Sequence, residues 1–339
     1  MRDIISNENE RRMDIDTIMS KQVDPNDFTP TNIHEIKNYC YYGFSDRKYR
    51  PKYWKILLGY YSKNKFNTSN YYREKRKAYK EYIKDLDEHY YDNINSFKVI
   101  RNDLSRTIII PIENNDGQKT CSFLDKTSIN SQLTNRSVLE RILKCFVVHN
   151  KSIGYFQGMH MLIIHIFYVM ANSEDQEDRQ YSEEDTFFCF LSLITELYEQ
   201  IISNIEQGGE SMEVILNNIH FILKNVDKDL FQVCEDKKLF QTGFCIRWLM
   251  FSFSTEFKLE NVLWLWDRLL SDKRRFEMIY YCAAAIFVIM KNVIMTEETE
   301  GCLEVLQKPF LLDVQTIFNT ADAMRLKIHK ESNFTKEEE

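Results

Sequence analysis

Gly154-Tyr-Phe-Gln-Gly-Met159 is the stretch on which the interpretation of this sequence depends. Glycine on both sides of Tyr-Phe-Gln lets the backbone turn sharply and approach a large neighbour closely. Upstream, a Ser-Val-Leu-Glu capping box at 137–140 opens a segment whose apolar residues recur with the helical period. Downstream, residues 159–170 are almost wholly apolar, which is typical of a helix in the protein core. The pattern therefore predicts that Gln157 lies on a bend between two core helices, a rigid support for a functional side chain.

A second stretch, Ile100-Arg-Asn-Asp-Leu-Ser-Arg106, ends 51 residues before Gln157. The guanidinium of Arg106 is a planar fork of donors that suits phosphate, and Gln157 carries both a donor and an acceptor. An arginine that neutralises a transferring phosphoryl group and a glutamine that orients the attacking water are the two parts of a GTP hydrolysis site. Each stretch alone also has a structural interpretation. Asp103 and Arg106 have the spacing of a surface ion pair, and a glutamine between glycines is usually a turn residue.

Composition favours a helical protein with a large core. The chain has 339 residues, 44% of them hydrophobic, with only nine glycines and five prolines. No proline occurs between Pro111 and Pro309, and proline is the strongest helix breaker. This length allows one large domain or two lobes.

Charge and cysteine content limit the possible partners. A net charge of -7 argues against nucleic acid as the main partner. The basic run Arg73, Lys75, Arg76 and Lys77 invites a nucleic-acid interpretation, but interleaved acidic residues favour a solvated helix face. The eight cysteines form no Cys-x-x-Cys pair, no histidine cluster has zinc spacing, and the cysteines fit a reducing compartment. We therefore expect no metal site.

The two ends of the sequence are polar. We expect residues 1–32 to form a flexible arm without a signal peptide, and residues 331–339 to form a frayed tail. The longest uncharged apolar run, 278–290, is shorter than the roughly 20 residues of a membrane span, so it predicts a buried helix.

The rest of the chain gives mainly helical signals. The segment 174–185 is acidic and predicts a surface connection, 107–111 predicts an extended segment without a partner strand, and 113–135 predicts a long, functional or mobile loop. The expected helices begin at Pro51 and continue at 70–89, 137–149, 159–170, 186–206, 212–226, 229–239, 242–253, 260–270, 276–295, 300–306 and 312–329.

Three signatures in order resemble the TBC domain, the catalytic module of GTPase-activating proteins for Rab GTPases. They are Arg50-x-x-x-Trp54, then Ile100-x-x-Asp103-x-x-Arg106, then Tyr155-x-Gln157-Gly158-Met159. The second half adds Arg247-Trp248, Glu256-Phe257 and Trp264-Leu-Trp-Asp267, which resemble the second lobe of that family. The resemblance covers residues 43 to about 320.

The resemblance implies an all-α, two-lobed, V-shaped fold within 33–330, with an N-lobe of about 33–210 and a C-lobe of about 211–330. It also implies a GTPase-activating protein, a catalytic activator rather than a stand-alone enzyme, with Arg106 and Gln157 as fingers supplied in trans. Tyr155 and Gly158 are then expected to shape the bend and touch the switch region of the Rab, and Asp103 to pair with and orient the finger element.

The partner that the resemblance implies is a Rab-family GTPase in its GTP form. The Rab brings GTP and Mg²⁺, so the chain itself needs no cofactor. Neither nucleic acid nor direct membrane insertion is expected. We expect a cytoplasmic protein that visits endomembranes through its Rab partner.

The sequence departs from the family pattern beside both fingers. His160 and Met161 stand where the family usually has Asn and an acidic residue, and Ile108 stands where it usually has Phe. These departures leave open a catalytically weak scaffold that binds a GTPase or another partner without stimulating hydrolysis. An unrelated helical adaptor is the third alternative.

Overall fold

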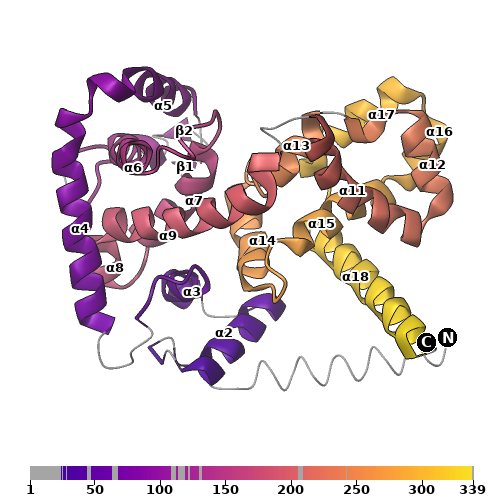
Figure 1. Ribbon diagram of the computed structural model, residues 1–339, viewed down its shortest axis with the longest axis horizontal. Coiled ribbons are helices and arrows are strands. Elements are labelled where there is room, and N and C mark those ends of the chain that lie inside the picture. The colour runs from indigo at the N-terminus through magenta and orange to yellow at the C-terminus, as the bar shows by residue number, and fades with distance from the viewer. Residues whose placement is uncertain are drawn as a thin grey trace. The chain divides into compact units, whose positions relative to one another are not determined.

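Helices make up nearly all of the described chain in the computed structural model (Figure 1). The structure describes residues 24, 26–27, 29–43, 47–62, 68–107, 112–113, 119–120, 123–129, 132–204, 209–241 and 243–337. Two units are distinguished by their internal contacts. Unit 1 comprises the described residues up to Leu193 together with Trp266–Lys273, and unit 2 comprises Ile194–Leu265 and the residues from Arg274 onward. The all-α prediction is confirmed, whereas the lobe boundary near residue 210 stays a prediction.

Unit 1 is built around α6, Asn135–His149, which packs against α4, α5 and α7 (Figure 1). One face of α6 is fully buried because its apolar residues repeat with the helical period, as predicted. The N-cap lies three residues earlier than expected: Thr134 rather than Ser137 caps the helix and accepts a hydrogen bond from Ser137 N at 3.2 Å. The other helices that contribute to unit 1 are α2 Pro30–Tyr42, α3 Arg50–Leu57, α4 Thr68–Glu88, α5 Ile94–Arg106, α7 His160–Ala171, α8 Gln176–Gln180 and α9 Ser182–Leu197, with short 3-10 turns at Arg47–Tyr49, Tyr91–Asn93 and Phe123–Asp125.

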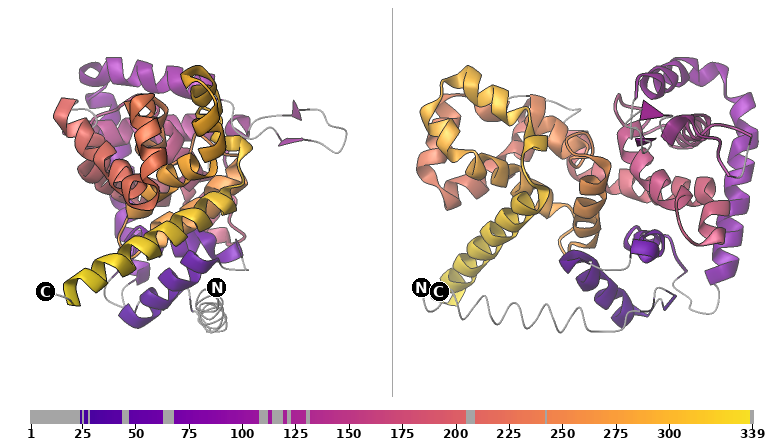
Figure 2. Two further views of the ribbon diagram at one scale, coloured as in Figure 1. Left: turned by 90° about the vertical axis from the view of Figure 1, so that its right-hand side faces the viewer. Right: turned by 180° about the vertical axis from the view of Figure 1, so that it is seen from behind.

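Unit 2 is built around α15, Glu277–Ile289, and α18 packs along it (Figures 1 and 2). The apolar run 278–290 is this buried helix, as predicted. The predicted helix 276–295 is in fact two helices, α15 and α16, which meet at Met290. The remaining elements that contribute to unit 2 are a π-helical turn Tyr198–Ile202, α11 Gly209–Val226, α12 Lys228–Asp236, α13 Gly243–Met250, α14 Leu259–Ser271, α16 Lys291–Thr296, α17 Thr299–Leu306, α18 Val314–Glu337 and 3-10 turns at Leu239–Gln241 and Pro309–Leu311.

Two local predictions were wrong. No partner strand was expected next to the extended segment at 107–111, but β1 Ile112–Glu113 pairs with β2 Lys119–Thr120 in a small antiparallel ladder, which stands away from the helices of unit 1 in Figure 2. The expected tail is helical through residue 337, because α18 continues past the polar residues after position 330. Most of the expected arm lies outside the described residues, and its positions 30–32 already belong to α2.

The first of the three signatures, Arg50-x-x-x-Trp54, stabilises the fold. Asp267 accepts hydrogen bonds from Arg50 Nε at 3.0 Å and from Trp54 Nε1 at 2.8 Å. Positions 50 and 54 are one helical turn apart, so both donors reach the same carboxylate from α3. Burial raises the pKa of Asp267, although Arg50 opposes that shift. Arg50-x-x-x-Trp54 therefore serves to anchor the end of α14 on α3.

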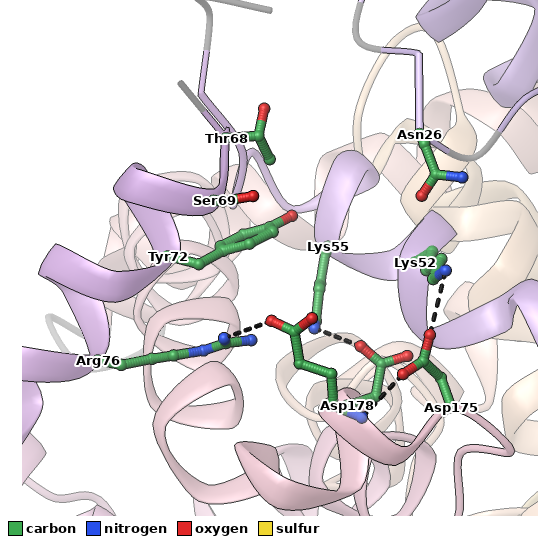
Figure 3. Close-up of a pocket in the computed structure, with 10 residues that line it drawn as sticks. Asn26, Lys52, Lys55, Thr68, Ser69, Tyr72, Arg76, Asp175 and Asp178 are labelled. Carbon is green, nitrogen blue, oxygen red and sulfur yellow. Dashed lines mark hydrogen bonds and ion pairs between the residues drawn. The ribbon is translucent and has the colours of Figure 1, made fainter. Parts of the chain in front are cut away.

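A buried ionic cluster, formed by Lys55, Arg76, Asp178 and Asp185, joins α3, α4, α8 and α9 within unit 1. Lys55 Nζ lies 2.6 Å from both Asp178 Oδ1 and Asp185 Oδ2, and Arg76 donates to both oxygens of Asp185 at 2.9 and 2.8 Å. Burial opposes ionisation of Asp185, but the two cations outweigh it and lower the pKa of Asp185. Figure 3 shows Lys55 and Arg76 beside a polar cavity of about 300 Å³, with Asp178 facing Lys55.

This cluster corrects two interpretations of the sequence. Arg76 is buried, although its basic run was predicted to be a solvated face; Arg73 and Lys77 are exposed as predicted. The acidic segment 174–185 is not simply a surface connection, because Asp178 and Asp185 turn inward to neutralise cations from helices about 100 positions upstream.

Candidate functional site

Arg106 is the last residue of α5, and its side chain is exposed. Phe97, Ile100 and Leu104 are buried, which fixes the helix face that Arg106 does not share. Thr107 ends the helix in an extended conformation, and its hydroxyl donates to Asp103 O at 2.7 Å. Among the described residues, no ion pair or hydrogen bond engages the Arg106 side chain. The guanidinium is therefore presented to solvent from a well-anchored helix end.

Gln157 is also exposed, on the bend between α6 and α7. Phe156 and Met159 on either side of it are buried, so the bend is fixed to the core while its glutamine points outward. Gly154 has φ 66° and Gly158 has φ 92°, in the region that favours glycine. The predicted mount between two core helices is confirmed in its backbone: α6 ends at His149 and α7 begins at His160.

Asp103 joins the two segments. Its Oδ2 accepts a hydrogen bond from Tyr155 OH at 2.7 Å and another from Gly158 N at 3.2 Å. Asp103 lies one turn before Arg106 on α5, and Gly158 directly follows Gln157 on the bend. Both exposed side chains therefore project from segments that share one carboxylate. Within the described part of the chain, Asp103 pairs with the glutamine bend and not with Arg106.

Tyr155 acts in this site as a hydrogen-bond donor. Burial, together with the hydrogen bond to the Asp103 carboxylate and its negative charge, raises the pKa of Tyr155 well above its ordinary value. The phenol therefore stays protonated at physiological pH and keeps its bond to Asp103. The fold brings Tyr155, Gly158 and Asp103 together, and their hydrogen bonds hold the bend in place.

His160 and Thr107 also belong to the site, and the sequence analysis gave neither of them a role. His160 Nε2 lies 2.8 Å from Thr107 Oγ1, and its Nδ1 lies 3.3 Å from Tyr155 OH. Burial lowers the pKa of His160, and the charge of Asp103 partly opposes that shift. In the sequence, only their positions could have pointed to these residues: Thr107 follows Arg106, and His160 follows Met159.

Three further observations concern the described residues. In that part of the chain no group of three or more His, Cys, Asp or Glu residues is arranged to hold a metal ion. Seven cysteines that the structure describes are free and buried. No helix in the described ranges combines the length and the apolar character that a bilayer crossing requires.

Comparison with known proteins decides the family. Residues 47–295 match the profile of the Rab-GTPase-TBC domain. The chain belongs to this family. The TBC domain is 25% identical over 248 residues to human TBC1 domain family member 13, covering 69% of this chain and 62% of that protein. It is 27% identical over 267 residues to the GTPase-activating protein GYP1 of Saccharomyces cerevisiae, covering 73% of this chain and 38% of that protein.

Solved structures support the fold of this TBC domain. The Ypt/Rab-GAP domain of Gyp1p superposes with a TM-score of 0.70 at 21% identity, covering 94% of this chain and 97% of that one. A Chlamydomonas flagellar RabGAP TBC domain gives a TM-score of 0.54 at 18% identity, covering 94% and 91%. The match to the curated relatives spans less than two thirds of their own length, for example 62% of TBC1 domain family member 13.

Proposed function

We propose that this chain is a GTPase-activating protein that accelerates GTP hydrolysis by a Rab-family GTPase, with Arg106 and Gln157 acting in trans on the nucleotide. The observation that carries the proposal is the carboxylate of Asp103, which bonds Tyr155 OH and Gly158 N. It ties together the two segments from which the exposed arginine and glutamine project. Membership of the Rab-GTPase-TBC family supplies the class of partner.

Each side chain has a distinct chemical task. Arg106 neutralises the negative charge that develops on the transferring phosphoryl group, which its planar fork of donors suits. Gln157 orients the attacking water through its donor and its acceptor. An arginine finger supplied in trans is worth about 10³–10⁵ in rate, or roughly 4–7 kcal/mol of barrier.

The remaining reactants come with the partner. The Rab in its GTP form brings GTP and Mg²⁺, and the chain contributes side chains alone. We place the protein in the cytoplasm, with transient visits to endomembranes through the Rab. Neither nucleic acid nor direct membrane insertion has a part in this function.

The test is single-turnover GTP hydrolysis by a panel of Rab proteins, with wild type, Arg106→Ala and Gln157→Ala side by side. Wild type should accelerate one or a few Rabs. Arg106→Ala should lower the stimulated rate by about 10³-fold or more because it removes the phosphoryl-facing charge. Gln157→Ala should lower it by about 10²-fold because the water loses its orientation.

Two matched controls separate catalysis from general damage. Arg101→Ala removes an exposed arginine from the same helix, one that pairs with Glu140 at 3.1 Å, and Gln176→Ala removes an exposed glutamine from α8. Both should retain wild-type acceleration. If no Rab is accelerated by wild type while a Rab still binds, the proposal fails and the scaffold alternative replaces it.

A further inference from the structure

His160 lies at the junction of the two segments that carry Arg106 and Gln157. It is the first residue of α7, directly after the bend, and its side chain is buried. One edge of the imidazole faces Thr107, the residue after Arg106, with Nε2 2.8 Å from Thr107 Oγ1. The other edge faces the bend, with Nδ1 3.3 Å from Tyr155 OH and 3.6 Å from Asp103 Oδ2. A single ring therefore spans from the end of α5 to the bend.

Donor and acceptor accounting assigns the proton of the imidazole. The only hydroxyl hydrogen of Thr107 is used on Asp103 O at 2.7 Å, so Thr107 Oγ1 must accept a hydrogen bond from His160 Nε2–H. The hydroxyl hydrogen of Tyr155 is likewise used on Asp103 Oδ2. The contacts form a closed circuit: Asp103 accepts hydrogen bonds from Thr107 and Tyr155, and His160 contacts both of these residues.

This circuit acts where a helix is weakest. The last carbonyls of a helix lack intrahelical partners, so its final turn frays unless side chains hold it. Arg106 occupies that final turn. The turn is held by Thr107 N on Leu104 O at 3.3 Å, by the Arg136 guanidinium on the same carbonyl, and by His160 on Thr107.

We propose that His160 is a positioning residue for the GTPase-activating reaction: it fixes the end of α5 against the bend and so sets the distance between Arg106 and Gln157. The inference rests on the proposed function and goes beyond it, because His160 was met in the sequence as a departure that weakened the catalytic interpretation. The circuit makes that departure part of the site.

Side-chain length decides which residues at position 160 can reach Thr107. The amide atoms of an asparagine lie as far along the side chain as Nδ1, so an asparagine at position 160 reaches Tyr155 and falls short of Thr107. A glutamine places its amide nitrogen at the depth of Nε2 and can donate to Thr107 Oγ1. Asparagine can therefore replace only the contact of Nδ1 with Tyr155, and glutamine can replace the contact of Nε2 with Thr107.

The experiment measures kcat and KM on a Rab that wild type activates, for His160→Leu, His160→Asn, His160→Gln and Thr107→Val. His160→Leu and His160→Asn should lower kcat by about tenfold or more with little change in KM, since a small displacement of a reacting group costs up to about 10²-fold. His160→Gln should restore most of kcat. Thr107→Val should match His160→Leu, and the double variant should lose no more than either single variant.

Controls keep the outcome decisive. His165→Gln alters another buried histidine of α7, whose Nδ1 contacts Met161 O and whose ring packs against Trp266, and it should leave kcat unchanged. If His160→Leu does not fold, Thr107→Val carries the test from the partially exposed side of the contact. Wild-type kcat in both His160→Leu and Thr107→Val, with Arg106→Ala inactive, overturns this inference alone. A wild type that accelerates no Rab overturns the proposed function and this inference together.

Discussion

Arg76 and Arg106 lie on consecutive helices of unit 1 and are used in opposite ways. Arg76 is buried, donates to both oxygens of Asp185 at 2.9 and 2.8 Å, and contacts Glu177 at 2.7 Å. Arg106 is exposed, and the described residues give its side chain no carboxylate. The carboxylate one turn before it, Asp103, is committed to the bend instead.

This difference shows how an arginine side chain is kept available for a partner protein. A buried cation must be neutralised locally, because an unpaired charge in the interior is costly. An arginine that acts on a partner must avoid that pairing and still be held in place through its backbone. Unit 1 meets both conditions for Arg106, because the Asp103 carboxylate one turn before it already accepts hydrogen bonds from Tyr155 OH and Gly158 N.

Removing each arginine in turn should produce the largest contrast. Arg106→Ala should lower the stimulated hydrolysis rate by about 10³-fold or more and leave Tm unchanged, because the side chain is exposed and has no hydrogen bond or ion pair with the described residues. Arg76→Ala should lower Tm while the folded fraction keeps its rate, because Asp185 loses a buried partner. Stopped-flow hydrolysis and thermal melting of both variants test this. An equal decrease in Tm for both variants would contradict the prediction that only Arg76 stabilises the fold.

The two carboxylates that hold Arg76 should differ in the stability they provide. Asp185→Asn leaves Lys55 and Arg76 under-neutralised in the interior and should cost about 3–5 kcal/mol of unfolding free energy. Glu177→Gln changes a carboxylate that is 63% exposed, and exposed pairs contribute about 0–1 kcal/mol. Urea unfolding of the two variants measures the difference. Equal costs would mean that burial of the cluster does not govern its strength.

The buried His165 should make the stability of the protein depend on pH. Burial lowers the pKa of His165 to about 4, below the ordinary 6.5, so the unfolded chain binds the proton more readily than the folded one. Stability from this group is complete above pH 6.5 and is lost as pH falls toward 4, by up to about 3 kcal/mol. His165→Leu should flatten that part of the curve. Parallel unfolding curves for wild type and variant between pH 7 and 4 would contradict it.

The smallest expected effect concerns the bend itself. Gly154 has φ 66° with open space where a Cβ would lie, so Gly154→Ala should cost only backbone strain, about 1–2 kcal/mol. Gly243→Ala, at the start of α13 and also without a close neighbour, should instead stabilise by about 0.4–1 kcal/mol. Calorimetry distinguishes the two signs. A stabilising Gly154→Ala would show that the bend does not require its positive φ.

Periodic features were predictable from the sequence. The buried helices α6, α7 and α15 follow from apolar repeats, which are local signals that short windows contain. The bend between α6 and α7 followed from its two glycines. The ordered signatures were enough to predict the family.

Pairings between distant residues were not predictable. Asp267 meets Arg50 and Trp54 across more than 210 positions, and Arg76 meets Asp185 across 109 positions. No local pattern distinguishes such a carboxylate from a solvated one, because the charge is the same and only the fold decides its burial. The contact of His160 with Thr107 is hidden for the same reason.

The bond between Asp267 and α3 has a consequence for how the chain is made. Unit 1 takes residues 266–273 from far beyond its main segment, which closes at Leu193. Synthesis proceeds at about 5–20 residues per second, so α3 waits roughly 4 to 15 s on the ribosome between the emergence of position 193 and that of its partner carboxylate. During that interval the indole of Trp54 and the guanidinium of Arg50 lack their native acceptor. A chain that ends before residue 267 would therefore lack both the last segment of unit 1 and the acceptor of Arg50 and Trp54.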